Sequence, residues 1–374
     1  MMAEMSKCDF IRQVIFVNPT ISIRDHFVST QSKKAISFGT SSHVFPRKVF
    51  PKVTVYQPVT FLPCKTRLPI LKKIEDDIFL RIIRHLNRGL PYILFMNCPN
   101  IRSPWVIDTL LEKAEVSFFD FSDDFSELGF EESTKALFRH NSEKYAKAAD
   151  VVLAVNEHIK EKYAHLNSNI QVIRNATNYS NFDREHFTPI EVLEKIKQGN
   201  NFIIGYSGIA SFSRIDTGLL DFLIEKRPLW QYVFVGPAHQ NFVERYAKYQ
   251  NVHMIEAVSY QDLPCYIRYF DVAMVPFLTN DHTKGNDLLK FHDFLAMGKP
   301  VVSTDIGGAS DLQELVSLAN SPSAFLEKLE KALCHQQEES ILKRKSKALE
   351  NSWPIRIKRV EKLISHQLKY NSLA

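Results

Sequence analysis

The feature that most constrains the fold of this chain is a regular alternation of short apolar segments with stretches of helical periodicity. Apolar segments of four or five residues read as β-strands at Val14–Val17, Val53–Tyr56, Tyr92–Met96, Val116–Asp120, Val151–Val155, Ile170–Ile173, Phe202–Tyr206, Tyr232–Val235, Val252–Ile255, Val272–Val275 and Pro300–Ser303. Helical periodicity fits many of the segments between them, including Ile74–Asn87, Ser133–Ala148 and Asp287–Met297. Strands that alternate with helices predict parallel sheets covered by helices, and therefore an α/β protein.

Two domains are expected, because 374 residues exceed what one hydrophobic core usually serves. The strand and helix series breaks after Phe182 and resumes at Phe202, and Pro189 and Gly199 lie in the charged stretch between. We therefore expect a Rossmann-like domain at residues 1–183, a linker at 184–199, a second Rossmann-like domain at 200–335 and a tail at 336–374. The tail is amphipathic and basic, and we expect it to pack back on the first domain.

Composition and charge narrow the classes of partner. The net charge is +5, but residues 1–110 hold 16 Lys and Arg against 7 Asp and Glu, a balance of +9 that leaves −4 for the remainder. This excess suggests either an anionic partner, such as a phosphorylated acceptor or lipid head groups, or a generic solvated basic face. No nucleic acid is expected, because no zinc, helix-turn-helix or aromatic-basic signature accompanies the charge.

The same sequence favours a cytoplasmic location. Peripheral contact with the inner face of a membrane is compatible with that location. No apolar run approaches the roughly 20 residues that a membrane span needs, and the first ten residues lack the apolar core of a secretory signal. The five cysteines are scattered singly, without the spacing of a zinc site or a disulfide framework. We therefore expect reduced thiols and no metal.

The segment from Gly285 to Leu312 is the most informative for chemistry. It reads as a helix that Asn286 or Asp287 caps, followed by the turn residue Gly298 and a buried strand. A diphosphate can bind the free N–H groups at a helix start, where the helix dipole favours negative charge. Lys290 could add a cation there, and Asp293 could accept hydrogen bonds from ribose hydroxyls. The alternative is a plain surface helix.

This segment resembles the donor-binding motif of GT-B glycosyltransferases, specifically those called group 1 or family 4. The resemblance rests on two stretches, FLAMGKPVVSTDIGG at Phe294–Gly308 and YFDVAMVPF at Tyr269–Phe277. The stretches GYSGIASFSRIDTGLL, VSYQDLPCYIRYFDVAMVPF and ENSW look like the branch that makes teichuronic acid and related polysaccharides. In the first half, FFDFSDDF, AADVVLAVNE and VIRNATNYSNF also resemble the family pattern. The resemblance implies two Rossmann-like domains that face each other across a cleft, with the C-terminal helix crossing back to the first.

The resemblance also implies roles for particular residues of a donor site. Asp293 stands where the second of two family glutamates binds the ribose, whereas Gly285 stands where the first would contact the donor sugar, so that contact is absent. Arg214 stands near the family lysine that neutralises the diphosphate, and Ile209 replaces the accompanying arginine. The expected donor-binding residues, all at the carboxyl ends of strands or around the helix start, are Gly208, Arg214, Asp287, Leu288, Leu289, Lys290, Asp293, Gly307 and Gly308.

The implied reaction moves a sugar from a nucleoside diphosphate, UDP or GDP, to a glycan or lipid-linked acceptor, with no other cofactor. Arg214 and Lys290 would stabilise the charge on the leaving phosphates without a metal. Asp123 and Asp124 lie on the acceptor side. An inverting route would need Asp123, Asp124 or His26 as a base, whereas the resemblance favours retention.

Two other functions remain open from the sequence. One is a nucleotide-sugar 2-epimerase with the same fold, for which no matching pattern of carboxylates and histidines is apparent. The other is a catalytically degenerate scaffold that binds nucleotide sugar or a partner transferase, which Gly285 and Ile209 motivate.

Overall fold

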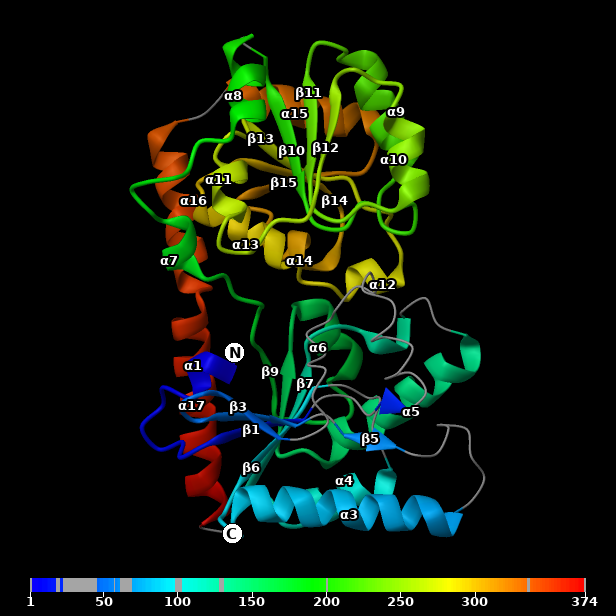
Figure 1. Cartoon of the computed structure of the whole chain (residues 1–374), viewed down its shortest axis with the longest axis vertical. Helices are drawn as coiled ribbons and strands as arrows, with labels where there is room; N and C mark the ends of the chain where they lie inside the picture. Colours follow the sequence, from blue (N-terminus) through cyan, green and yellow to red (C-terminus); the bar gives the residue numbers. More distant parts are fainter. Residues whose placement is uncertain are drawn as a thin grey trace.

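The computed structural model describes residues 2–17, 21–22, 46–56, 58–60, 69–97, 103–127, 131–199, 201–334 and 337–372. Two α/β units are stacked along the long axis of the molecule, as Figure 1 shows. The upper unit contains a six-stranded sheet, and the lower unit contains a four-stranded sheet beside smaller ones. His26, a candidate base from the sequence, lies outside the described residues.

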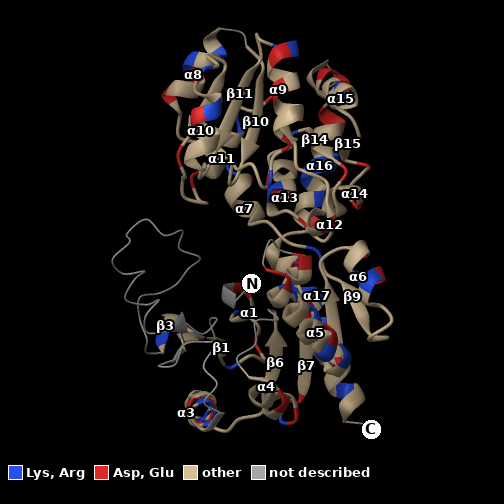
Figure 2. Cartoon of the chain, turned by 90° about the vertical axis from the view of Figure 1, so that its right-hand side faces the viewer, with Lys and Arg blue, Asp and Glu red and all other residues tan. Residues whose placement is uncertain are grey.

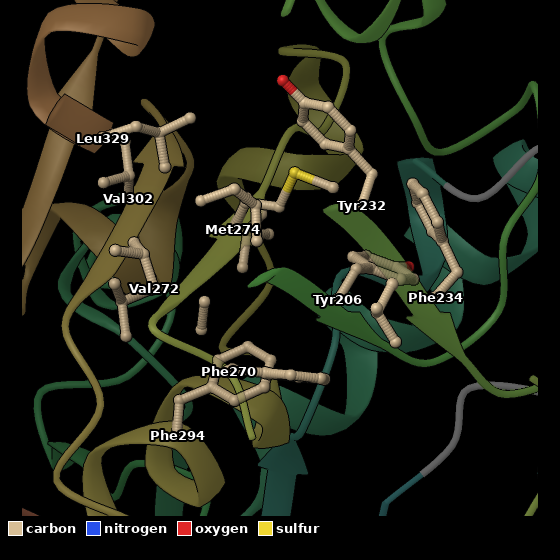
Figure 3. Packing of buried hydrophobic residues seen from close by; sticks show 14 of the residues in the cluster. Tyr206, Tyr232, Phe234, Phe270, Val272, Met274, Phe294, Val302 and Leu329 are labelled. Atoms are coloured by element: carbon tan, nitrogen blue, oxygen red, sulfur yellow. The ribbon is translucent and has the colours of Figure 1, made fainter. Parts of the chain in front are cut away.

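The second domain is built on six parallel strands in the order β12-β11-β10-β13-β14-β15. Their bounds are β10 (Ile203–Ser207), β11 (Gln231–Val235), β12 (Val252–Ile255), β13 (Val272–Val275), β14 (Val301–Thr304) and β15 (Val316–Ala319). The helices after them are α9 (Thr217–Lys226), α10 (Gln240–Tyr246), α11 (Leu263–Ile267), α13 (Leu289–Ala296) and α15 (Pro322–Cys334). Because helices cover both faces of a parallel sheet, its central strands can be apolar throughout. Figure 3 shows this core, in which Tyr206, Phe234, Phe270 and Met274 are buried.

The first domain has a four-stranded parallel sheet in the order β6-β7-β8-β9. Its strands are β6 (Ile93–Met96), β7 (Val116–Phe121), β8 (Val151–Ala154) and β9 (Ile170–Val172), and its helices are α3 (Pro69–Asn87), α4 (Pro104–Leu111), α5 (Glu132–Ala148) and α6 (Glu157–Tyr163). A smaller sheet pairs β1 (Val14–Val17) with β4 (Val53–Tyr56) and β4 with β3 (Arg47–Phe50). In it, β3 is an exposed antiparallel edge strand with a register shift, which suits the proline-rich surroundings of this segment.

The C-terminal tail joins the two domains. Its first helix, α16 (Glu338–Glu350), packs on α13, and its second, α17 (Trp353–Asn371), runs down the first domain (Figure 1). Val360 and Ile364 of α17 are buried against Phe118 and Val151. α17 begins at Trp353, after a break at residues 351–352, and Pro354 lies in its first turn, as suits a residue without an N–H. The expected return of the C-terminal helix to the first domain is therefore confirmed.

Candidate active site

The strand order of the second domain defines where a ligand can bind. The chain leaves the sheet in opposite directions after the adjacent strands β10 and β13, and ligands of open α/β sheets bind outside the carboxyl ends of the strands at such a switch point. The loop after β10 starts with Gly208, whose φ of 119° is reserved for glycine. A Cβ on the neighbouring Gly236 would lie 2.6 Å from the carbonyl oxygen of Gly208. Two glycines thus bring two strand ends close together.

Two basic side chains meet at this point. The Nζ atom of Lys290 lies 4.0 Å from the ring centre of Tyr206 and 4.7 Å from that of Phe277. It would also lie 3.0 Å from a Cβ on Gly208. Burial, together with the nearby Arg214 guanidinium, lowers the pKa of Lys290 well below its ordinary value. In the described part of the chain, neither Arg214 nor Lys290 forms an ion pair with a carboxylate. Two neighbouring basic groups with no carboxylate of the described residues at ion-pair distance form a site for an anion, whose charge would favour the protonated form of Lys290.

The start of α13 differs from the prediction. The helix begins at Leu289, and its N-cap residue is Leu288, which has no side-chain cap. Neither Asn286 nor Asp287 therefore caps it. Among the described residues, the backbone N–H groups of Leu289 and Lys290 donate to no protein acceptor. N–H groups free to bind an anion are thus present, one or two residues further along the chain than predicted. Leu289 is exposed there, whereas Leu288 packs on the core of the second domain.

Asp287 has a structural role instead of the predicted donor contact. Its side chain is fully buried and lies 2.8 Å from Nη2 of Arg174 and 3.2 Å from Nε2 of His292. Its Oδ2 also accepts from the backbone N–H of Asn175 at 2.8 Å. Burial opposes ionisation, but His292, Arg174 and these hydrogen bonds outweigh it and lower the pKa of Asp287. Because Arg174 and Asn175 follow β9, this network holds the two halves of the molecule together.

Gly307 and Gly308 also serve packing rather than ligand approach. A Cβ on Gly307 would lie 1.7 Å from the carbonyl oxygen of Lys284, and one on Gly308 would lie 2.7 Å from Cα of Asp287. The Gly308 N–H donates to the carbonyl oxygen of Asn286 at 2.7 Å. The space beside both glycines is therefore filled by protein. The close approach that they permit is that of α14 (Gly307–Ser310) to the segment before α13.

Asp293 lies one turn along α13 from Lys290 and keeps one oxygen available. Its Oδ1 accepts from the hydroxyls of Tyr260 at 2.6 Å and Thr177 at 2.7 Å. No described residue donates to its Oδ2. Burial raises the pKa of Asp293 to about 6, against the opposing effect of the two hydroxyl donors. A carboxylate oriented in this way can accept a hydrogen bond from a ligand hydroxyl through its second oxygen.

The two candidate aspartates of the first domain differ sharply. Asp123 faces the second domain, where its Oδ1 lies 3.9 Å from Nδ1 of His282 on α12 (Asp281–Lys284). Burial raises the pKa of Asp123 to about 6, and burial with the nearby Arg214 lowers that of His282. Asp124, by contrast, is buried and bound to Lys162, Ser126 and Tyr163. That Asp124 acts as a base stays a prediction, although in this structure its carboxylate is bound by Lys162, Ser126 and Tyr163.

The packing around position 285 explains why a glycine is found there. A Cβ on Gly285 would lie 2.7 Å from Cβ of Asp124 and 3.3 Å from Cδ1 of Ile159. The glutamate that the family carries there could not be accommodated in this arrangement. The absent side chain thus reflects contact with the first domain.

Sequence reasoning missed four residues of this region: Thr177, Tyr260, Arg174 and His282. Thr177 and Tyr260 orient Asp293, Arg174 joins the domains, and His282 faces Asp123 with a buried Nδ1 that has no hydrogen-bond partner among the described residues. Arg174 and Asp287 are 113 positions apart, so no local pattern could reveal their contact. For His282, a histidine three residues before position 285 of the motif was the available signal.

Comparison with known proteins agrees with this architecture. Residues 219–335 match the family described as "Glycosyl transferases group 1". Over 148 residues, the chain is 22% identical to the "Putative teichuronic acid biosynthesis glycosyltransferase TuaH" of Bacillus subtilis (strain 168). That match spans 39% of this chain and only 36% of the relative.

Solved structures match over most of the chain. A glycosyltransferase from Rickettsia africae ESF-5 superimposes with a TM-score of 0.61 at 17% identity and covers 84% of this chain and 86% of its own. HepE of Anabaena in complex with UDP superimposes with a TM-score of 0.60 at 16% identity and covers 82% and 86%. The molecule therefore has the GT-B fold of glycosyltransferases, as the sequence predicted. Over residues 219–335, its second domain is similar to the group 1 glycosyl transferases.

Proposed function

We propose that this protein transfers a sugar from a nucleoside diphosphate to a glycan or lipid-linked acceptor, without a metal. This rests on one observation: the basic side chains of Arg214 and Lys290 lie at the switch point of the second sheet, and neither forms an ion pair with a carboxylate of the described residues. We assign donor binding to residues 200–335 and acceptor binding to residues 1–183. The family match of the second domain and its GT-B neighbours support this division of labour.

The donor would bind along the start of α13. Its diphosphate would lie against the N–H groups of Leu289 and Lys290, beside Gly208 and between the two cations, which would neutralise its charge. The free Oδ2 of Asp293 would accept from a ribose hydroxyl. UDP is the favoured nucleotide, since a structural neighbour was solved with UDP.

Transfer would proceed through an oxocarbenium-like state in which negative charge develops on the leaving phosphate. Arg214 and Lys290 are positioned to stabilise that charge, and each such donor is worth about 2.7–4 kcal/mol of barrier in comparable sites. Asp123 lies 3.9 Å from His282 and within the electrostatic influence of Arg214, and it would orient the acceptor hydroxyl. We propose a retaining reaction in which the leaving phosphate takes the acceptor proton.

Binding tests the donor assignment first. In a thermal-shift series with UDP, GDP and dTDP, UDP at a hundred times its dissociation constant should stabilise the protein by about 2.7 kcal/mol. The substitution Arg214→Met should abolish that shift, whereas Arg245→Met, on the exposed face of α10, should not. No response to any nucleotide would refute the donor site.

A degenerate scaffold is the second candidate function, because the Gly285 packing removes a family carboxylate from the site. Release of nucleoside diphosphate from UDP-sugars separates the two. UDP binding without release, across a panel of sugars and acceptors, would favour the scaffold. Release that depends on Arg214 would favour the transferase.

A further inference from the structure

The solvent-facing side of α3 has an unusual composition. Among residues 70–87 of this helix, whose side chains the structure describes, every exposed residue is either aliphatic or basic, namely Ile70, Leu71, Lys72, Lys73, Ile74, Ile78, Arg81, Arg84 and His85. Of its three acidic residues, Asp76 is buried and Glu75 and Asp77 are half-buried; Asp77 lies one turn from both Lys73 and Arg81 on the exposed side. A helix on the surface of a soluble protein normally exposes charges of both signs and buries its aliphatic residues. We call this set of exposed residues the α3 face.

Apart from Lys72, which lies two turns before Phe79, the α3 face is not the side by which the helix is anchored. The opposite side packs through Phe79 against Tyr56 and against Val106 of α4, with Leu86 and Leu110 alongside. Large aliphatic side chains nevertheless remain in solvent: Ile70 is 76% exposed, Ile78 52% and Ile74 49%. They occupy the first half of the helix, and the exposed Arg81, Arg84 and His85 occupy the second. The core of the domain thus does not account for them.

The position of the helix leaves the candidate site free. Figure 1 shows α3 lying across the end of the first domain that is remote from the second domain and from α12, α13 and α14. Figure 2 views the same helix end-on, again at the outer edge of the domain. A flat partner could cover the α3 face without closing the boundary between the domains.

We propose that the α3 face docks on the surface of a membrane that contains anionic lipids. The isoleucines would enter the boundary between head groups and acyl chains, and the basic residues would contact lipid phosphates, as in helices that lie in the membrane plane. No helix among the described residues is apolar and long enough to cross a bilayer, so α3 would lie on it. A second copy of the chain fits poorly, because two α3 faces would bring like charges together. The inference deepens the proposed function by making the acceptor lipid-linked, but docking itself requires no catalysis.

Vesicle flotation of the full chain tests the inference. Binding should be strong to vesicles of phosphatidylcholine and phosphatidylglycerol, weak to phosphatidylcholine alone, and reduced by salt. The variant Ile74→Glu/Ile78→Glu should lower the bound fraction at least about tenfold. The matched control is Leu342→Glu/Leu349→Glu, which adds the same charge at exposed leucines of α16 and should bind like the wild type.

Three outcomes would overturn the inference. These are an absence of binding to anionic vesicles, equal binding by the Ile74→Glu/Ile78→Glu variant, and a dimer in size-exclusion chromatography that this variant dissociates. The last would make a second copy the occupant. The UDP thermal shift reports that each variant is folded. Loss of nucleotide binding with intact vesicle binding would count against the proposed function alone, and the reverse result would count against the α3 face alone.

Discussion

The guanidinium of Arg174 lies 2.8 Å from the carboxylate of Asp287 and 2.8 Å from that of Asp311, and so joins the segment after β9 to two segments of the second domain. The same side chain donates to the carbonyl oxygen of Gly308. The Asp287 side chain has no exposed surface. The relative placement of the domains in this structure thus depends on a buried charge network rather than on the linker alone.

Removing Arg174 should therefore destabilise the protein strongly. Arg174→Met leaves Asp287 buried with only part of its counter-charge, and breaking a buried ion pair typically costs about 3–5 kcal/mol. Urea unfolding should show a clearly lower midpoint. Arg184→Met is the matched control, because Arg184 is exposed and has no carboxylate partner among the described residues: it donates to the carbonyl oxygen of Gln261 and lies over the ring of Phe187. Equal midpoints for the two variants would contradict the structural role of Arg174.

Enlarging Gly285 should also be harmful. Gly285→Ala places a methyl group 2.7 Å from Cβ of Asp124, and overpacking of this kind costs about 1–3 kcal/mol. Gly285→Glu, which restores the family residue, should lower rather than raise transfer. Gly218→Ala is the control, since its new Cβ meets nothing closer than 3.4 Å and α9 should gain helix propensity. A more active Gly285→Glu variant would show that the domains separate at this point during turnover.

Neutralising either cation should weaken the donor site without unfolding the protein. Arg214→Met and Lys290→Met should each reduce transfer about 10²–10³-fold, the effect of removing one preorganised donor from a developing anion. Circular dichroism should stay unchanged. Because Lys290 is held between two aromatic rings and beside Arg214, diphosphate binding should raise its pKa. Full activity in both variants would refute the phosphate clamp.

Donor binding should depend on pH through Asp293. Burial raises the pKa of this carboxyl to about 6, so it is ionised above that pH and protonated below it. Protonation removes an acceptor for ribose, and we expect the UDP dissociation constant to rise as the pH falls through about 6. Titration calorimetry should show that Asp293→Asn abolishes this step. Asp123→Asn should retain it, even though the pKa of Asp123 is also about 6. If the pH dependence were lost in Asp123→Asn instead, the titrating group would be Asp123 of the first domain.

The tail should be essential for the first domain. Ile364 is 1% exposed and packs with Val116, Phe118 and Val151, so Ile364→Ala should cost about 2–5 kcal/mol through the cavity that it leaves. Tyr370→Ala, at a 63% exposed position of the same helix, should change little. Thermal unfolding of both variants would check this, and a neutral Ile364→Ala would show that α17 is not part of that core.

Strands with strong local patterns were predictable almost residue by residue. Val252–Ile255 and Val272–Val275 have the predicted bounds, because each is a continuous apolar run between polar turns. The strand β15 (Val316–Ala319) was not predicted. It is short and includes one serine and one alanine, which have weak strand preference. It gains its conformation from pairing with β14.

In the candidate site, too, some features were predictable from the local sequence and others were not. The stretch Phe294–Gly308 indicated the family, and the nearness of Lys290 to the strand ends follows from the helix that carries it. The functions of its neighbours were not predictable, since Asp287, Gly307 and Gly308 fit the same motif but are occupied by packing. Asp123 and Asp124 are adjacent in sequence, yet one faces the domain boundary and the other binds Lys162.

The sequence by itself therefore determined the α/β class, the two-domain plan and the resemblance of the second domain to group 1 glycosyl transferases, because strand and helix periods and a contiguous motif are local properties of the chain. Only the tertiary structure decided which polar residues of that motif are free for a ligand. That depends on partners more than a hundred positions away, such as Arg174 for Asp287, and a buried charge is available for chemistry only when the fold leaves it uncompensated.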